Sequence, residues 1–222
     1  MSNSENGYAG ARDIHSGTSE FNALTFLVNQ ILSERNFAAM VQVKAVTNDG
    51  GLSPVGYVDV QPMVNQLDGN NNAVPHGVVH HLPYFRLQGG ANAVILDPQV
   101  GDIGLAVFAD RDISAVKATK KPANPGSMRR SAKADGIYVG SYLGASPTQY
   151  VQFSASGITL VSPIAINFEA PSVAMTAPTI AINASTSVAI NTPSLTHNGK
   201  NIGDTHAHSG VSPGSSNTGV PV

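Results

Sequence analysis

The spacing of hydrophobic residues changes twice along this chain of 222 residues. Between Phe21 and Leu32 the apolar residues recur at helical spacings, with Ser19 suited to be the N-cap and Glu20 in the first turn. This pattern predicts one amphipathic helix. Packing of its apolar side against its own domain is favoured over docking to another protein. Further along the chain, apolar and polar residues alternate, which is typical of strands.

Residues 37–116 form short alternating segments separated by the turn clusters TNDGG, LDGNNN and QGG. Five strands are expected, from the segments MVQVKAV, PVGYVDVQPMV, HGVVHHLPYFRL, NAVILD and DIGLAVFA. Five strands in about 80 residues fit an OB-fold-like barrel, although other small barrels have the same strand count. The predicted fold class is therefore mainly β, with a helix before the barrel.

A third pattern fills the C-terminal part of the chain, where pairs of apolar residues at alternate positions recur with steps of 9, 7, 8 and 7 residues. The pairs are Ile164/Ile166, Val173/Met175, Ile180/Ile182 and Val188/Ile190, followed by Leu195. Each unit predicts a short strand and a corner, too small to bury its apolar face alone. Three chains that each give one strand per turn of a triangular prism would bury these faces and close the sheet edges by symmetry. A β-sandwich of the same strands is the alternative.

Charge is distributed unevenly between the two halves of the chain. Charged residues make up only 12% of the sequence and the formal net charge is -2, so neither nucleic acid nor an anionic membrane surface is indicated as a partner. Residues 136–222 carry only Glu169, Lys200 and Asp204 as charged residues. A neutral region of short strands favours a narrow fibre over a globular sandwich.

Six of the 12 basic residues lie close together in residues 117–137, where prolines and a glycine interrupt any helix. They are Lys117, Lys120, Lys121, Arg129, Arg130 and Lys133. No aromatic residues lie between them to stack on bases, so the segment does not indicate binding of single-stranded nucleic acid. We interpret it as a solvated linker that joins two bodies or contacts an acidic partner.

The sequence offers no set of residues that indicates catalysis, and an enzyme is not expected. The absence of cysteine excludes disulfides, thiol nucleophiles and zinc–thiolate sites. Asp110 and Asp112 have the residue types for acid/base chemistry, but no catalytic partner can be identified for them. Paired acids at a strand end more often form a solvated edge that discourages wrong strand pairing.

Three histidines lie close together in the predicted barrel, at positions 76, 80 and 81. His76 and His80 have the i, i+4 spacing that forms half a zinc site on a helix. Val78 and Val79 instead indicate a strand, where this spacing has no such meaning. Ordinary barrel histidines are the favoured interpretation, with His81 among them.

The most specific candidate for chemistry is the pair His206 and His208 near the C-terminal end. Two histidines separated by one residue point to the same side of an extended backbone, so they can share one ligand. Two imidazoles are too few to hold a structural metal ion, so other chains must complete such a site. Imidazole nitrogens suit iron, zinc or nickel, and the ligand type alone does not choose among these ions.

These features together resemble the central spike, or membrane-piercing needle, at the tip of contractile phage tails and related injection machines. The resemblance rests on the barrel-like first half, the neutral strand repeats and above all the ending HNGKNIGDTHAHSGVSPGSSNTGVPV. In that family a T-H-x-H segment and a tail rich in Gly, Ser, Pro and Asn form the apex of a trimer, whose histidines bind one buried iron ion in octahedral geometry. Here the segment is matched by Thr205, His206, Ala207 and His208, and the tail by Gly210, Pro213, Gly214, Asn217, Thr218 and Gly219.

The resemblance implies a homotrimer in the virion, at the tip of the tail baseplate, joined to tail tube or baseplate hub proteins. It would pierce the host bacterial outer membrane by transient, mechanical contact. The resemblance also implies one iron ion per trimer, held by six nitrogens from His206 and His208 of the three chains. Whether calcium or chloride ions also lie along the axis stays open.

The sequence thus predicts five consecutive parts. They are an N-terminal arm and helix (1–36), an OB-fold-like barrel acting as a collar (37–116), a basic linker (117–137), a trimeric β-helix spike (138–195) and an apex with the HxH metal site (196–222).

Two other functions are weighed against the spike. A tail-associated, metal-dependent hydrolase of host surface polymer would use His206 and His208 at an open metal site, but Asp204 is the only acid nearby in the sequence. A nucleic-acid-binding barrel with a trimerising tail would need basic and aromatic residues along its strands, which carry only Lys44 and Arg86 as bases. The spike is favoured over both.

Overall fold

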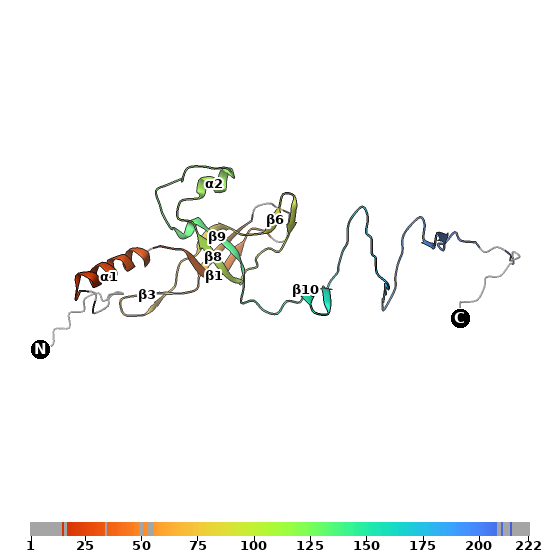
Figure 1. Cartoon of the computed structure of the whole chain (residues 1–222), viewed down its shortest axis with the longest axis horizontal. Coiled ribbons are helices and arrows are strands. Elements are labelled where there is room, and N and C mark those ends of the chain that lie inside the picture. Colours follow the sequence, from red (N-terminus) through yellow and green to blue (C-terminus); the bar gives the residue numbers. More distant parts are fainter. Residues whose placement is uncertain are drawn as a thin grey trace. The chain divides into compact units, whose positions relative to one another are not determined.

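A computed structural model of the chain describes residues 15, 17–33, 35–48, 51–52, 56–207, 210 and 214. Across these residues the fold is mainly β, with a curled half-barrel sheet and one N-terminal helix (Figure 1), which confirms the predicted class at this level. The chain divides into two units, residues 1–163 and 164–222, and each is described by itself. Among the described helices, none combines the length and apolar composition needed to cross a lipid bilayer.

The N-terminal helix α1 spans Glu20–Ser33. The backbone N–H of Asn22 donates to the hydroxyl of Ser19 at 3.2 Å, which caps the first turn as predicted. No residue of α1 is buried, and the expected packing of this helix on its own domain is therefore wrong for the single chain. The physical reason is that the sheet closes its core without any residue of the helix. Six apolar side chains of α1 remain more than half exposed: Phe21, Leu24, Leu27, Val28, Ile31 and Leu32.

Five antiparallel strands form the main sheet of unit 1, in the order β5-β2-β1-β8-β9. The sheet curls until its two end strands approach each other. The backbone N–H of Phe85, just after β5, donates to the carbonyl of Tyr138 in β9 at 2.8 Å. The strands are β1 (Ala38–Val46), β2 (Tyr57–Pro62), β5 (Val79–Pro83), β8 (Ile103–Phe108) and β9 (Gly136–Ser141).

The hydrophobic core lies on the inner face of this sheet. Side chains alternate across a strand, so the buried residues of β1 and β2 are two apart: Val41 and Val43 on one, Val58 and Val60 on the other. The full set of buried hydrophobic residues is Val41, Val43, Val58, Val60, Leu82, Tyr84, Ala106 and Tyr138. Four of the five predicted strands contribute to this core as the alternating pattern indicates.

The fifth strand of the sheet is not the one predicted. The segment NAVILD supplies only β7 (Asn92–Val94), which pairs with β6 (Leu87–Gly89) in a separate hairpin. The sheet is completed instead by β9, whose residues the sequence pattern had assigned to the linker and the start of the spike. Close approach of β8 and β9 depends on a missing side chain, because a Cβ on Gly104 would collide with the carbonyl oxygen of Gly140.

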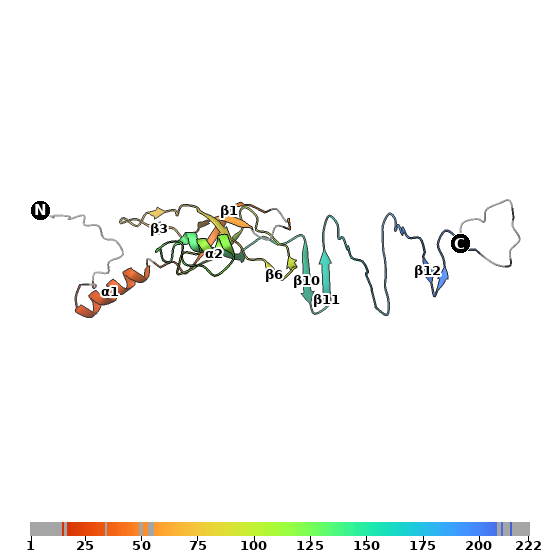
Figure 2. The same ribbon diagram turned by 90° about the horizontal axis from the view of Figure 1, so that it is seen from above.

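Two further hairpins belong to unit 1. Strands β3 (Gln66–Leu67) and β4 (Ala73–Val74) enclose a short loop, which the carboxylate of Asp68 closes by accepting the N–H groups of Asn70 and Asn72, each at 2.8 Å. Strands β10 (Tyr150–Ser154) and β11 (Gly157–Val161) pair with each other (Figure 2). No residue of β10 or β11 is buried, although five of the ten are Val, Ile, Leu or Phe.

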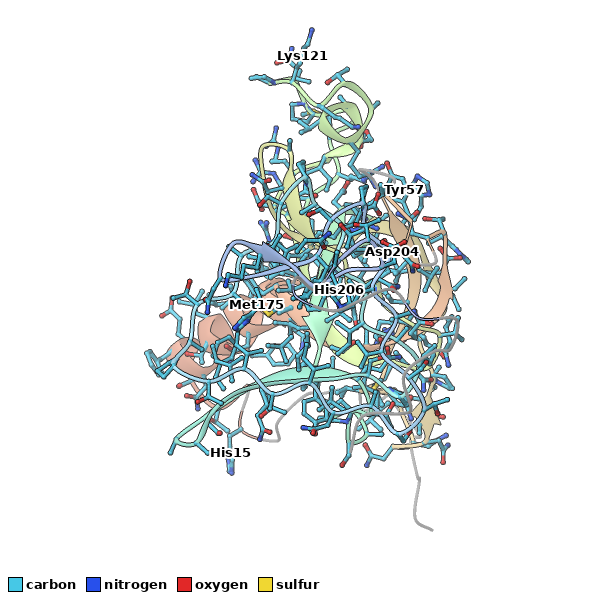
Figure 3. All side chains as sticks on the ribbon, turned by 90° about the vertical axis from the view of Figure 1, so that its right-hand side faces the viewer. His15, Tyr57, Lys121, Met175, Asp204 and His206 are labelled. Carbon is cyan, nitrogen blue, oxygen red and sulfur yellow. The ribbon has the colours of Figure 1, made fainter. Side chains whose placement is uncertain are left out.

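The basic segment connects β8 to β9 within one sheet, so it does not join two bodies. It contains the short helix α2 (Ser114–Thr119) and the 3-10 helix η1 (Lys133–Asp135). This β8–β9 connection, residues 109–135, projects from the sheet, and Lys121 lies at its outer end (Figure 3).

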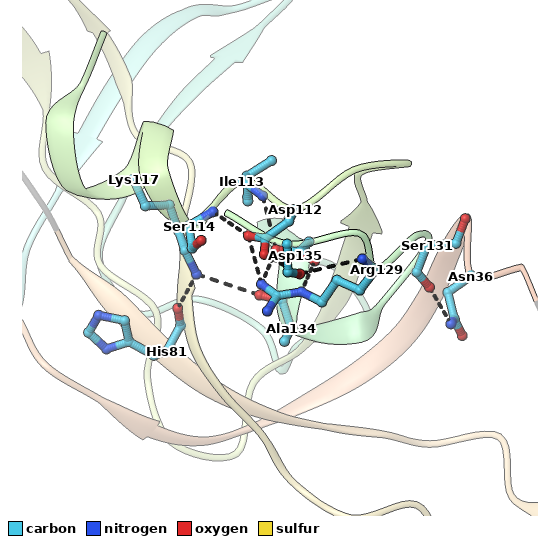
Figure 4. A network of polar contacts seen from close by, with 11 residues as sticks. Asn36, His81, Asp112, Ile113, Ser114, Lys117, Arg129, Ser131, Ala134 and Asp135 are labelled. Atoms are coloured by element: carbon cyan, nitrogen blue, oxygen red, sulfur yellow. Dashed lines mark hydrogen bonds and ion pairs between the residues drawn. The ribbon is translucent and has the colours of Figure 1, made fainter. Parts of the chain in front are cut away.

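Where the β8–β9 connection meets the sheet, one arginine lies between two buried aspartates and pairs with both (Figure 4). The guanidinium of Arg129 donates to Asp112 at 2.9 Å and to Asp135 at 2.7 Å. Asp112 is only 5% exposed, so its assignment to a solvated edge is wrong. Arg129 follows it by 17 residues and supplies the charge that makes its burial tolerable. The side chain of Asp110, in contrast, is 58% exposed.

These contacts keep both buried carboxylates ionised. Hydrogen bonds from Ser114 and Ser127, together with the charge of Arg129, lower the pKa of Asp112 to about 2. The hydrogen bond from Arg129 also lowers the pKa of Asp135, against the opposing effect of burial.

Unit 2 has little regular structure within one chain. Its strands are β12 (Thr196–His197) and β13 (Lys200–Asn201), and residues 164–195, all of them described, carry no helix or strand (Figure 2). The eight paired apolar side chains of the repeat are between 45% and 84% exposed. Strand pairing needs a second segment at hydrogen-bonding distance, so the predicted short strands do not form in a single chain.

Arg129→Ala should lower the thermal midpoint of the barrel by more than about 5 °C, because it leaves two buried carboxylates without their cation. Arg130→Ala is the matched control. Its guanidinium lies 3.5 Å from Asp110 and both side chains are more than half exposed, so the midpoint should change by less than about 2 °C. The buried Tyr84 and Tyr138 let near-ultraviolet circular dichroism follow the barrel in a chain without tryptophan. Equal midpoints for the two variants would contradict the role of Arg129.

The barrel should also lose stability in acid, between about pH 4 and pH 2. Because folding lowers the pKa of Asp112, its stabilising contribution is complete above its unfolded pKa of about 3.9 and is lost as the pH falls towards about 2. Asp112→Asn should be less stable than the wild type at neutral pH and lose less further stability on acidification. Asp110→Asn, which changes an exposed carboxylate, is the matched control. Urea midpoints at about pH 7, 5 and 3 measure this, and identical pH profiles for all three proteins would refute it.

Candidate metal centre

The candidate centre begins with a hairpin in which a two-residue turn joins β12 to β13. Thr196 pairs with Asn201 and His197 with Lys200. The two residues between the strands, Asn198 and Gly199, have φ values of 49° and 75°. A type I′ turn requires positive φ at both positions, and Asn-Gly is the residue pair that best accepts this conformation. The hairpin is therefore encoded locally, by the dipeptide itself.

A compact turn follows the hairpin and is organised by Asn201. Its side-chain oxygen accepts the backbone N–H of Gly203 at 2.8 Å. Its side-chain nitrogen donates to the hydroxyl of Thr205, also at 2.8 Å. Both ends of one amide are thus used to hold residues 203 and 205 in place.

His206 is oriented by the same turn. Its backbone N–H donates to the carbonyl of Gly203 at 3.2 Å, and its ring nitrogen Nδ1 lies 2.6 Å from the same carbonyl oxygen. A carbonyl oxygen only accepts hydrogen bonds, so Nδ1 carries the hydrogen. In the neutral ring the lone pair is then on Nε2. This is the arrangement of metal-binding histidines, which usually donate their other ring N–H to a carboxylate or a carbonyl.

The geometry of His206 fits the predicted role of a metal ligand, but the described residues of one chain do not complete a site. His206 is exposed, and the second predicted ligand, His208, lies outside the described residues. Within the described part of the chain no three His, Cys, Asp or Glu side chains are grouped so that they could hold a metal ion. A metal ion at His206 would therefore need further ligands from outside this described group.

His197, which lies outside the T-H-x-H segment, makes a local contact. It lies on β12 beside the turn, and its Nε2 is 3.2 Å from the side-chain nitrogen of Asn198. No sequence pattern singled out Asn201 or Gly203 as functional residues. The Asn-Gly turn signal could have located the hairpin, but the use of a backbone carbonyl as a partner for His206 leaves no mark in the residue types.

The barrel histidines are occupied by contacts within unit 1. His80 Nδ1 donates to Asp59 at 2.7 Å with the imidazole largely exposed, and the ring of His81 stacks on Tyr57 with a centroid distance of 3.7 Å. Partial burial acts to raise the pKa of Asp59, but the hydrogen bonds from His80 and the backbone of His81 lower it overall. The carbonyl of His76 accepts the side-chain N–H of Gln61 at 2.8 Å. These contacts support the interpretation as ordinary barrel histidines.

The predicted acidic and basic residues of the barrel also form internal pairs. The exposed Asp110 accepts a hydrogen bond from Arg35 at 2.9 Å. Asp112 pairs with Arg129 instead, so the two aspartates have different partners. Arg86 donates to Asp97 at 2.6 Å, and both side chains are at most 5% exposed. A guanidinium buried in this way is not available to a phosphate, which weakens the nucleic-acid alternative further.

The chain was also compared with known proteins. Neither the family models nor the curated proteins give a match to it.

Proposed function

We propose that this chain is the central spike of a contractile phage tail or a related injection machine. Three copies form a needle that pierces the outer membrane of the host bacterium, at the tip of the tail baseplate in the virion. The needle transmits the force of contraction mechanically, so the function includes no chemical turnover.

The observation that carries this proposal is the exposed apolar repeat of unit 2. Full burial of a Val, Ile or Met side chain stabilises a fold by about 1.5–3 kcal/mol, and eight such side chains per chain are left at least 45% exposed. A soluble protein rarely leaves so much periodic apolar surface in contact with water. Packing against further copies of the same repeat can bury all of these apolar side chains together, because each copy has the same spacing.

Three copies fit the repeat better than a sandwich within one chain. Steps of seven to nine residues give each chain one short strand and one corner per unit, which is one side of a triangular prism. Closure by three-fold symmetry also leaves no strand edge open to further pairing. The few charges of residues 136–222 suit a narrow needle, since buried or closely spaced charges would be costly there.

The apex of the proposed trimer holds one iron ion through His206 and His208 of the three chains. When bound, the ion would accept the lone pairs of these imidazole nitrogens and so join three chain ends. Six imidazole nitrogens disfavour zinc, whose structural sites are almost always four-coordinate. The Nε2 lone pair of His206, set by the hydrogen bond at Nδ1, supports its part in this donor set.

Unit 1 is the proposed collar that joins the needle to the tail tube or the baseplate hub. The half-barrel has its own hydrophobic core, and ion pairs within unit 1 hold its β8–β9 connection. It can therefore fold as an attachment module while the needle depends on assembly.

The native protein should contain three chains and one iron ion. The mass measured by native mass spectrometry should be three times 22.9 kDa plus the metal, and elemental analysis should give one iron for every three chains. A monomer would contradict the proposed needle. A trimer with another metal ratio would leave the needle standing and contradict the proposed apex.

The double variant His206→Ala, His208→Ala should lose the iron and keep the trimer, because the apolar repeat lies outside the apex. Its chain ends should be cut faster by proteases, since termini are poorly ordered unless they are tied down. His197→Ala is the matched control, as it removes a nearby exposed imidazole outside the motif, and it should retain the iron. Full iron content in the double variant would contradict the assigned ligands.

A further inference from the structure

We infer that Asn201 is a positioning residue for the metal ligand His206, and that Thr205 acts with it. This inference rests on the proposed function, because it assigns a role to residues around the proposed iron site. It concerns only contacts within one chain, so it can be tested both with and without metal.

The chain of contacts runs from Asn201 to the imidazole in two steps. The side-chain amide of Asn201 holds the N–H of Gly203 and the hydroxyl of Thr205, each at 2.8 Å. The peptide groups of residues 203–205 are thereby fixed between two hydrogen bonds. The carbonyl of Gly203 belongs to this fixed segment, and it receives Nδ1–H of His206 at 2.6 Å.

This arrangement selects one of the two neutral forms of the His206 ring. A ring without a partner at Nδ1 exchanges between the Nδ1–H and Nε2–H forms, and only the first leaves Nε2 able to bind a metal. A carbonyl placed at Nδ1 before assembly removes that exchange and fixes the ring direction. Outer hydrogen-bond partners of this kind typically account for about 10- to 100-fold in metal affinity.

The residue types around the turn fit this role. Asparagine offers an acceptor and a donor on one short side chain, and both are used here. Gly203 sits close to it: a Cβ at this position would lie 3.2 Å from the side-chain oxygen of Asn201, closer than an ordinary contact. A glycine therefore lets the amide reach the backbone without displacement.

The test compares variants of the full-length protein by competition of iron(II) against a chelator. Asn201→Ala should weaken iron binding by about 10- to 100-fold while native mass spectrometry still gives the wild-type oligomer. Lys200→Ala changes the neighbouring residue of β13 and is the matched control, with unchanged affinity. Thr205→Val should weaken binding, and Thr205→Ser, which keeps the hydroxyl, should restore it.

A second readout detects the role directly. In metal-free protein with the ring neutral, the ¹⁵N chemical shifts of His206 should report the Nδ1–H form in the wild type and in Lys200→Ala. They should report a mixture of both forms in Asn201→Ala. A merely structural role of Asn201 in the hairpin would not change the form of this ring.

Each outcome decides a different point. Wild-type affinity and an unchanged ring form in Asn201→Ala would overturn the inference. If that variant does not assemble, the Thr205→Val and Thr205→Ser pair decides, and equal affinity of the two would overturn it. A wild type that takes up no iron would refute the proposed apex, while the ¹⁵N shifts would still decide whether Asn201 positions the ring.

Discussion

The constraint on which the described structure depends is that, among the described residues, only the half-barrel buries a cluster of hydrophobic side chains. In the described residues, every buried hydrophobic side chain lies on or directly beside a strand of the five-stranded sheet. Helix α1, the β10–β11 hairpin and the repeat of unit 2 all have apolar faces that the single chain leaves in water. The half-barrel is therefore the self-sufficient part. The other described parts expose apolar surfaces, and under the proposed function identical copies cover those of the repeat, because they have the same periodicity.

Charge follows the same division. The buried carboxylates of unit 1 each have an arginine, Arg86 for Asp97 and Arg129 for Asp112 and Asp135. These pairs fix the positions of loops that have few apolar residues of their own. The proposed needle has neutral corners of Ser, Thr and Asn and no comparable loops. It therefore needs no such ion pairs, which is consistent with the near absence of charge after residue 135. The position of charge thus distinguishes the part that folds around a core from the part for which assembly is proposed.

Local patterns predicted what local interactions determine. Alternation located β1, β2, β5 and β8, and helical spacing with Ser19 located α1, because those signals depend on neighbours in the sequence. The pairing of β9 with β8 joins Tyr138 to Ala106, 32 residues away, and nothing within GIYVGS reports that partner. The burial of Asp112 likewise depends on Arg129, and an isolated acidic strand end is naturally taken to be solvated. The motif singled out His206 as a candidate ligand, whereas the orientation of its ring depends on a backbone carbonyl that no residue type encodes.

The composition after His208 explains why a metal ion is a suitable way to hold the proposed apex. The residues from 209 to 222 are mainly Gly, Ser, Pro, Asn, Thr and Val, with few large apolar side chains to bury where three chains converge. Hydrophobic burial scales with area and so becomes weakest at a narrow point. Coordination does not depend on area, but it needs ligands that already face the right way, since ordering flexible imidazoles during assembly costs entropy. A turn within each chain that sets the His206 ring, held by Asn201, meets this requirement before the chains meet. The division of roles is then between hydrogen bonds inside a chain, which orient the ligand, and metal bonds between chains, which join the ends.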